Sequence, residues 1–549
     1  MPAEHLCTCR LAQAAPREDC VPPASNAAAI ASRDPYGRLP HTVNSRTIRK
    51  LLIANRGEIA LRIIRSARVL GIATVAVYSE VDAGAAHVAA ADDARLIGPA
   101  EPAASYLNID AIIGAAQAAG ADAIHPGYGF LSERPEFARA VEAHDMVFVG
   151  PPADVMAALG DKVAARRIAV AAEVPVVPGI DTGELAAARK FAAEAGFPIL
   201  VKAAAGGGGR GMRVVADAPS LEAALEAASR EAQAAFGDGR VFLEKYLARP
   251  RHIEIQILGD HHGKVIALGE RECSIQRRHQ KIIEESPAPG LSTAMRDRMV
   301  EAALKLARAA GYRNAGTAEF LVDGDNFYFL EINARLQVEH PVTELRFGCD
   351  LVADQLRVAA GDHVADPPSP RGSAIECRIN AEDAAHDFRP AVGRVLKLNL
   401  PTGPGVRIDT HLGLGAEVSP YYDSLIAKLI CFGADREQAR SRTVAALGEF
   451  SLLGITNTAA FLRDIIASTP FAQADLSTRF LEENFAHWTN DEADLNLALV
   501  AAAMVAEGII GGARPAGEPA AADGGRHENG GGARSPWTEL AGFELWGKR

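Results

Sequence analysis

An apolar pattern that changes its period constrains the fold of this chain most strongly. Residues 50–54 form a short apolar run, residues 57–70 repeat apolar side chains at helical spacing, and residues 72–78 form a second strand-like run. This order predicts a βαβ unit, whose two strands are parallel. The alternation continues to the run at 146–149, which a Gly-Pro-Pro turn terminates. The sequence therefore predicts an α/β domain with a parallel sheet.

Beyond residue 200 the pattern changes from alternating strands and helices to hairpins. Strand-like runs flank a glycine-rich turn, a long alanine-rich helix follows, and further hairpin-like runs reach residue 333. A third, strand-rich segment covers about residues 374–432, and helical segments follow it to about residue 487. We therefore expect an α/β and α+β multidomain fold.

Charge and composition exclude two classes of partner. The chain has 549 residues, of which 48% are hydrophobic and 23% charged, enough for several packed cores. The net charge of -12 gives no basic footprint for nucleic acid, and no apolar run approaches the ~20 residues of a membrane span. The seven cysteines lack the paired spacing of zinc or disulfide frameworks, which predicts a reducing, cytoplasmic compartment.

A glycine-rich turn between two strand-like runs is the first chemical signal. Residues 206–209 are four consecutive glycines, with Lys202 before them and Arg210 after them. Glycine lets the backbone approach an anion closely, and the two cations add positive charge. The pattern favours a phosphate-binding lid, with a merely flexible hairpin as the alternative. It is neither a P-loop nor a dinucleotide fingerprint, because the residues that define those motifs are missing.

A pair of carboxylates is the second signal. Glu319 and Glu331 lie in strand-like runs on either side of the turn at 323–326, so a hairpin would bring them side by side. Together with the amide oxygen of Asn333 they supply hard oxygen ligands for Mg²⁺, which in turn would coordinate ATP phosphates. The alternative is two acids at a strand edge in solvent.

The segment directly after the second acidic run carries the third signal. Asn333, Arg335, Gln337 and Glu339 stand at alternate positions, and in an extended segment they would project to one face. An amide, a guanidinium, a second amide and a carboxylate on one face can hold an oxyanion and act on it. This signal weighs against the solvent-edge interpretation of the acids.

Six motifs together resemble biotin carboxylase, a member of the ATP-grasp superfamily. They are NRGEIA at 55–60, HPGYGFLSE at 125–133, the glycine-rich turn, RRHQK at 277–281, RLQVEHPVTE at 335–344 and ECRINAED at 376–383. The similarity covers about residues 50–487 and is to the biotin carboxylase region of acyl-CoA carboxylase α subunits. It implies a parallel-sheet pre-ATP-grasp N-terminal domain, an ATP-grasp domain and a β-rich C-terminal biotin carboxylase domain.

With this resemblance the chain divides into five expected segments. They are a disordered N-terminal extension (1–46), which reflects either an unstructured segment or a start codon placed too far upstream, the biotin carboxylase N-terminal domain (47–160), the ATP-grasp domain (161–370), the C-terminal domain (371–488), and a helical segment, Gly/Ala-rich linker and start of a truncated connecting domain (489–549).

The roles of the family carry over to the residues that match its motifs. For ATP binding these are Lys162, Lys202, Gly207, Gly208, Gly209, Glu244, Lys245, Leu247, His252, Gln276 and His279. For the metal, Mg²⁺ or Mn²⁺, they are Glu319, Glu331 and Asn333. For bicarbonate they are Lys281, Arg335, Gln337 and Val338; for biotin, Tyr128, Arg335 and Arg378; and for catalysis, Glu339 as the base with Arg335 and Lys281. For a single histidine such as His252, a structural role is an equal alternative.

The implied activity is that of an ATP-dependent ligase. Biotin carboxylase uses MgATP and bicarbonate to form carboxyphosphate and carboxylates carrier-bound biotin, as the first half-reaction of an acetyl-, propionyl- or other acyl-CoA carboxylase, an enzyme of fatty acid metabolism. Ala205 and Ala334 depart from the family pattern, but neither removes a catalytic group. Another ATP-grasp ligase that forms an acyl phosphate, and a non-catalytic scaffold within a carboxylase complex, are the two alternatives.

The resemblance also implies partners: a biotin carboxyl carrier protein or domain, a carboxyltransferase subunit, and a second copy of the chain in a homodimer. Lys397, Lys428 and Lys548 are the only lysines in the last third, and none of them neighbours a methionine. The Met-Lys-Met site of a biotinyl domain is therefore missing. We expect biotin as a substrate presented by another polypeptide and not attached to this chain.

Overall fold

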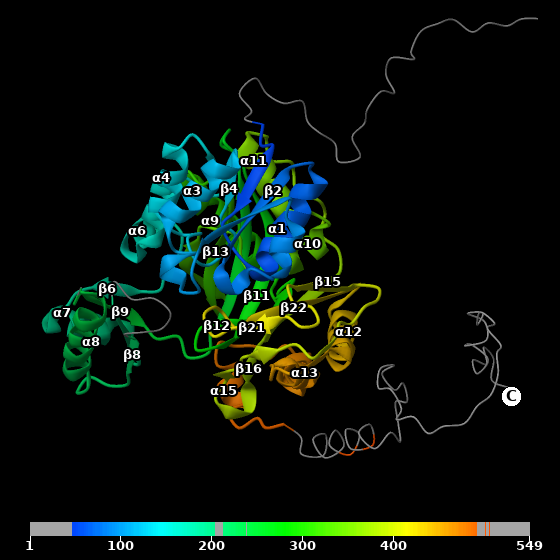
Figure 1. The fold of residues 1–549 in the computed structure, drawn as a ribbon. Helices are drawn as coiled ribbons and strands as arrows, with labels where there is room; N and C mark the ends of the chain where they lie inside the picture. The colour runs from blue at the N-terminus through cyan, green and yellow to red at the C-terminus, as the bar shows by residue number, and fades with distance from the viewer. Residues whose placement is uncertain (1–46, 204–211, 238, 491–499, 501–503, 505–549) are drawn as a thin grey trace, which may run out of the picture. The chain divides into compact units, whose positions relative to one another are not determined.

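The structure, a computed structural model, describes residues 47–203, 212–237, 239–490, 500 and 504 (Figure 1). The chain divides into two units, Met1–Thr489 and Asn490–Arg549, and all elements below belong to the first. The predictions for the N-terminal extension, for the glycine-rich turn with Gly207, Gly208 and Gly209, and for the linker beyond residue 490 lie outside the described residues.

Five parallel strands form the N-terminal sheet in the order β3-β2-β1-β4-β5. The strands are β1 Lys50–Ile53, β2 Ala73–Ser79, β3 Asp93–Gly98, β4 Ala123–His125 and β5 Val147–Phe148, and the helices are α1 Gly57–Val69, α2 Ala86–Ala90, α3 Ile109–Ala119 and α4 Pro135–Ala143, with short 3₁₀ turns η1 Glu80–Asp82 and η2 Pro102–Ala104. Leu51, Leu52 and Ile53 are fully buried, as expected for a parallel strand covered on both faces. The predicted βαβ unit is confirmed as β1, α1 and β2.

A separate four-stranded sheet forms the outer lobe, seen with α7 and α8 at the left of Figure 1. Helices α5 Ala153–Gly160 and α6 Lys162–Ala171 lead into it, and its elements are β6 Gly179–Asp181, α7 Leu185–Ala195, β7 Ile199–Ala203, β8 Met212–Val215, α8 Leu221–Phe236 and β9 Val241–Lys245. The sheet is antiparallel in the order β6-β9-β7-β8, so β7 and β8 flank the glycine-rich turn as predicted.

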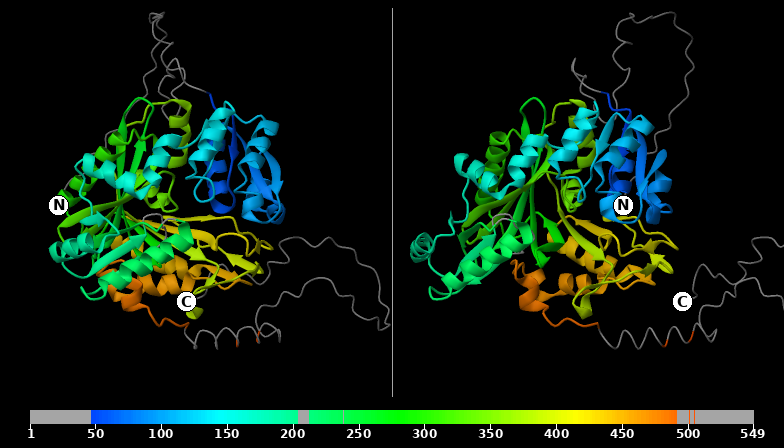
Figure 2. Two further views of the ribbon diagram at one scale, coloured as in Figure 1. Left: turned by 90° about the vertical axis from the view of Figure 1, so that its left-hand side faces the viewer. Right: turned by 60° about the vertical axis from the view of Figure 1, so that its left-hand side comes forward.

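One antiparallel sheet of eight strands runs through the rest of the fold in the order β14-β13-β10-β11-β12-β15-β22-β20. Its strands are β10 Arg251–Gly259, β11 Val265–Arg277, β12 Gln280–Ser286, β13 Asn314–Asp323, β14 Asn326–Asn333, β15 Ser373–Asn380, β20 Val406–Thr410 and β22 Leu425–Gly433. In both views of Figure 2 the green and yellow strands of this sheet lie side by side. The pairing of β12 with β15, with Glu284 opposite Glu376, joins the ATP-grasp segment to the C-terminal segment without a break.

Helices and small sheets surround this central sheet. The helices are α9 Thr293–Ala309, α10 His340–Phe347, α11 Leu351–Ala360, α12 Arg436–Glu449, α13 Ala459–Ala467, α14 Thr469–Ala472 and α15 Phe480–Asn484, with a 3₁₀ turn η3 Ala384–His386. The small sheets pair β16 Glu382–Asp383 with β17 Arg389–Pro390, β18 Gly393–Arg394 with β21 Glu417–Val418, and β19 Lys397–Asn399 with β23 Ser451–Leu453. No helix among the described residues is both long and apolar enough to cross a membrane.

A shared apolar core holds the N-terminal sheet against the two helices that connect β14 and β15. Ile63 of α1 belongs to one buried cluster with Phe347 of α10 and Leu351 of α11. Burial of a side chain of this size contributes roughly 1.5–3 kcal/mol. The same three helices lie directly behind the segment that carries Glu339, so this packing also fixes the candidate site.

Candidate active site

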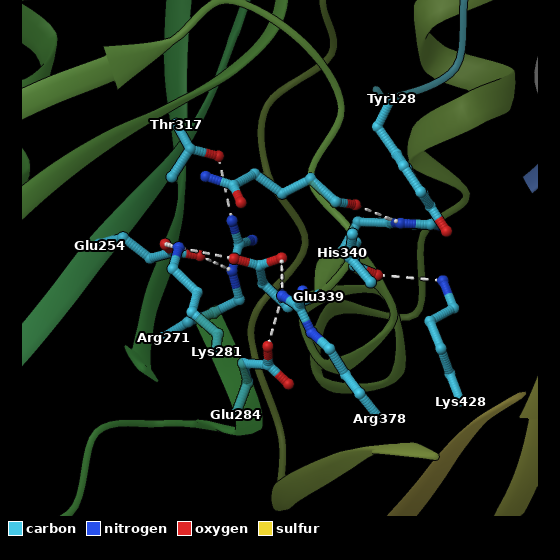
Figure 3. Close-up of polar contacts among 12 residues, drawn as sticks. Tyr128, Glu254, Arg271, Lys281, Glu284, Thr317, Glu339, His340, Arg378 and Lys428 are labelled. Carbon is cyan, nitrogen blue, oxygen red and sulfur yellow. Dashed lines mark hydrogen bonds and ion pairs between the residues drawn. The ribbon is translucent and has the colours of Figure 1, made fainter. Parts of the chain in front are cut away.

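The ammonium group of Lys281 is the centre of the candidate site. Its Nζ atom lies 2.7 Å from Oε1 of Glu319. It also lies 2.7 Å from Oε1 of Glu339 and contacts Glu254, and these three side chains, Lys281 included, are labelled in Figure 3. All three carboxylates are buried. Burial alone would lower the pKa of Lys281, but the three acids hold it well above its usual range. The ammonium is therefore charged and compensates a concentration of negative charge.

A tight hairpin places Lys281 at this position. Strands β11 and β12 pair Arg277 with Gln280, so only Arg278 and His279 form the turn. Both turn residues have positive φ, 47° and 67°, which is the conformation of a two-residue primed turn. Residues other than glycine adopt it at a cost, so the turn stores local strain next to the site.

The predicted acidic hairpin is present. Strands β13 and β14 place Glu319 directly opposite Glu331. Glu319 is 4% exposed, which rules out the solvent-edge alternative for this residue. Burial and the charge of Glu319 raise the pKa of Glu331, whereas Lys281 and His252 outweigh burial and hold the pKa of Glu319 well below its usual range. Lys162, His252 and Lys281 act against the rise in the pKa of Glu331, but they do not outweigh burial and the charge of Glu319.

The positions of Glu319 and Glu331 are compatible with the predicted metal site. Carboxylate oxygens are hard ligands that suit Mg²⁺, and a divalent cation between Glu319 and Glu331 would offset their repulsion. Asn333 donates its amide N–H to Glu319 over 2.8 Å, and its amide oxygen accepts a hydrogen bond from Arg335 over 3.1 Å. The amide oxygen of Asn333 has a second lone pair, so it could bind a metal while it still accepts from Arg335.

A second group of possible ligands lies on the other side of Glu319. The ligand atoms of His252, Glu254 and Glu319 lie within 4.8 Å of one another. Nε2 of His252 is 2.9 Å from Oε2 of Glu319, and burial, which would lower the pKa of His252, is outweighed by Glu319. Because the Lys281 ammonium already contacts both acids there, a cation fits better on the Glu331 side.

Glu339 stands at the start of α10, where it is the N-cap residue. Its side chain is fully buried; one oxygen meets Lys281, and the other lies 2.9 Å from Nη2 of Arg378. Burial would raise the pKa of Glu339, but Lys281, Arg378 and Arg271 together hold it far below its usual range. Glu339 is therefore ionised at neutral pH and can accept a proton.

The segment between β14 and α10 is not a regular strand, which differs from the extended segment expected. Asn333 and Gln337 nevertheless converge, because both amides donate to Oε1 of Glu319, over 2.8 and 2.9 Å. Arg335 is shared between two partners: its Nη2 atom donates to Asn333 over 3.1 Å, and its Nε atom lies 2.9 Å from Glu133, in the loop between β4 and α4. Asn333 and Gln337 therefore meet at Glu319, Arg335 joins them through Asn333, and Glu339 is linked to them through Lys281.

A cavity of about 470 Å³ opens beside this cluster. Its lining residues come from all three parts of the fold, and they include five of the predicted substrate residues: Tyr128, Lys281, Arg335, Val338 and Arg378. Arg378 contributes its guanidinium from β15, and burial, which would lower its pKa, is outweighed by Glu284 and Glu339. The cavity is large enough for a small ring with a side chain, and five cations line it: Arg56, Arg277, Lys281, Arg335 and Arg378.

The predicted nucleotide residues lie on the outer lobe and on the facing strands of the central sheet. Lys202 of β7 forms an ion pair with Glu244 of β9. Burial lowers the pKa of His279, and the charges of Lys202, His252 and Lys162 lower it further, so these four side chains lie within electrostatic reach of one another. Of the others, Leu247 and Gln276 are buried, whereas Lys245 is exposed.

Several charged residues of the cluster were missed in the sequence. Arg271 is fully buried and donates to Glu254, Gln256, Thr317 and Thr343. Glu254 lies opposite Glu319, and Glu284 contacts Arg378. On β10 the polar residues alternate with isoleucines, and alternation of this kind usually marks a solvent-facing side. This alternation is the only sequence pattern that could have indicated Glu254 and its neighbours. The fold is needed to show that the polar side of β10 faces inward.

Three family models match consecutive parts of the chain. They are described as Biotin carboxylase, N-terminal domain (residues 47–156), Carbamoyl-phosphate synthase L chain, ATP binding domain (residues 161–366), and Biotin carboxylase C-terminal domain (residues 376–483). Together with the two lobes and the buried acidic hairpin, they define the class of the protein. It is an ATP-grasp enzyme, an ATP-dependent ligase.

Similar proteins narrow this class. A biotin carboxylase from a Nostoc species is 50% identical over 442 residues, which cover 79% of this chain and 98% of that protein. The human mitochondrial propionyl-CoA carboxylase alpha chain is 47% identical over 455 residues, 81% of this chain but only 62% of that protein. Among solved structures, the biotin carboxylase domain dimer of Hydrogenobacter thermophilus 2-oxoglutarate carboxylase, in complex with MgADP, ADP and bicarbonate, matches with a TM-score of 0.76 and 43% identity over 81% of this chain and 100% of that one. The chain belongs to the biotin carboxylase family.

Proposed function

We propose that the chain carboxylates carrier-bound biotin with MgATP and bicarbonate through carboxyphosphate, releasing ADP and phosphate. The observation that carries this proposal is the contact of one ammonium, Lys281, with both the proposed base Glu339 and the proposed metal ligand Glu319. Removal of a proton from bicarbonate and transfer of the γ-phosphoryl group would then occur at adjacent positions, as formation of carboxyphosphate requires.

Glu339 acts as the general base in this proposal. Lys281 lowers the pKa of Glu339. Bicarbonate that draws Lys281 toward itself would therefore raise the pKa of Glu339 and make it a stronger base when bicarbonate is bound. Arg335, Gln337 and Val338 would hold the anion in line with the γ-phosphate. For Arg335 this requires release from Glu133, a partner that is 43% exposed and therefore only weakly bound in water.

The nucleotide would lie between the outer lobe and the central sheet. Lys162 and Lys202 would bind phosphates, Glu244, Lys245 and Leu247 would meet the adenine, and His252, Gln276 and His279 would line the site, with Gly207, Gly208 and Gly209 of the glycine-rich turn over the phosphates. Glu319 and Glu331, with Asn333, would hold Mg²⁺ or Mn²⁺. A metal ion there supplies positive charge that offsets the charge of the transferring phosphoryl group.

Biotin would bind in the cavity. Arg378 and Arg335 are planar cations on its wall, and such a group can stabilise negative charge on the ureido oxygen of biotin. Tyr128 lines the same space. Phosphate released from carboxyphosphate would take the ureido proton, and CO₂ would be transferred to the nitrogen.

The test is ADP formation by the purified chain with MgATP. We expect ADP formation to require bicarbonate and to increase with biotin, and a biotinylated carrier domain to be a much better substrate than free biotin. Bicarbonate-independent ADP formation that an amino acid or another carboxylate stimulates would instead support the alternative ATP-grasp ligase. No ATP cleavage under any of these conditions would support a non-catalytic scaffold.

The partners proposed are a biotin carboxyl carrier protein or domain, a carboxyltransferase subunit, and a second copy of the chain. The names of the relatives include both a propionyl-CoA and a 2-oxoglutarate carboxylase, and this variety supports a final acceptor chosen by the carboxyltransferase, within an acyl-CoA carboxylase or a related enzyme. The four described cysteines, Cys273, Cys349, Cys377 and Cys431, are free, which supports a location in the reducing cytoplasm.

A further inference from the structure

Lys428, on strand β22, is a lysine with no exposed side-chain surface. Its Nζ atom donates to the main-chain oxygen of Val338 over 3.0 Å and lies 3.1 Å from Oε1 of Glu58. Asp409 is 3.9 Å away, and the ring of Tyr128 has its centroid at 5.9 Å. One ammonium thus contacts the first turn of α1, the strand β20 and the segment that leads to Glu339.

A buried ammonium is stable only with compensating charge. Burial would lower the pKa of Lys428, but Glu58, Glu376 and Asp409 outweigh it and hold the pKa above its usual range. The group is therefore charged, and its hydrogen bond to Val338 is a charge-assisted one, roughly twice as strong as a neutral bond.

The other end of the same segment is also held by buried charges. Glu344, five residues after Glu339, lies 2.6 Å from Nη2 of Arg62 and 2.7 Å from Nη1 of Arg407. Arg407 in turn pairs with Asp409, which faces Lys428. The main chain around Glu339 is therefore fixed before and after the residue by cations from α1, β20 and β22.

Lys428 itself is not in a position to meet substrate. Glu58, Tyr128 and Val338 line the cavity of about 470 Å³, whereas Lys428 lies behind them and is not part of its wall. Any effect of this residue on the reaction must therefore pass through the groups it holds.

We propose that Lys428 is a positioning residue: it holds the main chain at Val338 so that the carboxylate of Glu339 stays in contact with Lys281 and Arg378. This inference rests on the proposed role of Glu339 as the base. Glu58 of α1 and Lys428 of β22 form an ion pair. The position of Glu339 therefore depends on the packing of both α1 and β22 against the segment at Val338.

The test separates positioning from stability. Lys428→Met keeps the length of the side chain but leaves Glu58 as an unpaired buried carboxylate, so the informative variant is Lys428→Met with Glu58→Gln, in which both charges are gone. Lys397→Met, an exposed lysine on β19, is the matched control. The readouts are the thermal midpoint, the KM for ATP, and the kcat and bicarbonate KM of bicarbonate-dependent ATP cleavage.

For the double variant we expect a thermal midpoint within about 5 °C of wild type, a KM for ATP within about threefold, and a kcat lower by about 10²-fold, the scale of a misplacement of about 1 Å. A kcat within threefold of wild type in the folded double variant overturns the proposal. If the double variant does not fold, Lys428→Arg decides: its larger guanidinium displaces Val338, so an unchanged kcat overturns the proposal and a fall of about tenfold with unchanged KM for ATP supports it.

These outcomes are distinct from failure of the proposed function. If the wild-type chain itself shows no bicarbonate-dependent ATP cleavage, the proposed function fails. If the wild type is active and the folded variants are equally active, only the role of Lys428 fails.

Discussion

The Nζ atom of Lys281 and the Oε1 atom of Glu339 lie 2.7 Å apart in a buried environment. The same nitrogen also meets Glu254 and Glu319, so a single positive charge stabilises three carboxylates. Each of these acids would repel the others without it, because charges this close interact strongly where water is excluded. Lys281 is therefore the cation that all three acids share, while Arg271 also pairs with Glu254 and Arg378 with Glu339.

Replacement of Lys281 by methionine should lower both the stability of the folded chain and its activity. Loss of one partner from a buried ion pair costs about 3–5 kcal/mol, so the thermal midpoint should fall clearly. Bicarbonate-dependent ATP cleavage should fall by at least about 10²-fold. Lys264→Met, which removes an exposed lysine paired with Asp366, is the control and should change neither quantity. A Lys281→Met chain with the stability of wild type would show that the three acids are protonated or separated.

Replacement of Glu339 by glutamine should separate binding from chemistry. The amide has the shape of the carboxylate but cannot take a proton from bicarbonate. We expect nearly normal affinity for ATP and a loss of carboxylation by about 10²-fold or more, the scale of a positioned general base. Nucleotide binding by calorimetry and carboxylation with labelled bicarbonate measure the two effects. A rate within a few-fold of wild type would reassign Glu339 to a structural role.

Glu331→Gln should weaken metal-dependent ATP turnover. Its carboxylate faces Glu319 across the β13–β14 hairpin, and among the described residues no ion pair to it is present, so the variant removes repulsion as well as the proposed ligand. The thermal midpoint without metal should therefore stay the same or rise, while turnover at a fixed Mg²⁺ concentration falls about tenfold or more. Glu417→Gln, an exposed glutamate on β21, controls for the chemistry of the substitution. Unchanged ATP turnover would contradict the metal assignment.

Lys202→Ala should suppress ATP cleavage through the nucleotide. The residue lies on β7 and pairs with Glu244, so its removal takes away a cation that would bind phosphate. We expect the KM for ATP to rise by about tenfold or more, with little change in the KM for bicarbonate. Equal increases in both constants would place Lys202 outside the nucleotide site.

Glu284 predicts a dependence of stability on pH. Burial, opposed by Arg378, raises its pKa to about 7. The folded state therefore holds a proton that the unfolded state loses near pH 4.3, so this contribution to stability is full below about pH 4 and is lost as the pH rises through 7. Glu284→Gln stays neutral and should show a smaller fall in thermal midpoint between pH 5 and pH 8 than wild type, by about 5 °C. An unchanged difference would mean that Glu284 is ionised in the folded state.

Local patterns predicted the parts of the site that are close in sequence. The turn at 323–326 predicted the hairpin that carries Glu319 and Glu331, but the register of that turn alone would place Glu319 opposite Leu330. A bulge between Glu319 and Phe320 shifts the register by one residue and brings Glu319 opposite Glu331. The apolar periods of residues 50–78 predicted β1, α1 and β2, because each of these elements lies within a short stretch of sequence. The six motifs indicated the family, which the comparisons confirm.

Contacts between distant parts of the chain could not be predicted in this way. Arg378 reaches Glu339 because β15 pairs with β12, and Arg335 contacts Glu133, a residue 202 positions earlier in the loop between β4 and α4. Both contacts depend on tertiary packing that no local period encodes. Lys428 was considered only as a possible biotin attachment site, since a lysine in an apolar strand carries no sequence signal for the main-chain oxygen it binds.

The unbroken pairing from β14 to β20 has a mechanical consequence. Glu319, Lys281 and Arg378 stand on strands of one hydrogen-bonded sheet, and a sheet shears only if whole ladders of bonds break together. The distances among these three groups are therefore as constant as the sheet itself. The outer lobe with Lys202 and Glu244 belongs to a different sheet and has no such tether. Any slow movement during turnover should therefore be a movement of the outer lobe, with the proposed nucleotide site, toward the central sheet. The positions of Glu319, Lys281 and Arg378 relative to one another should not change.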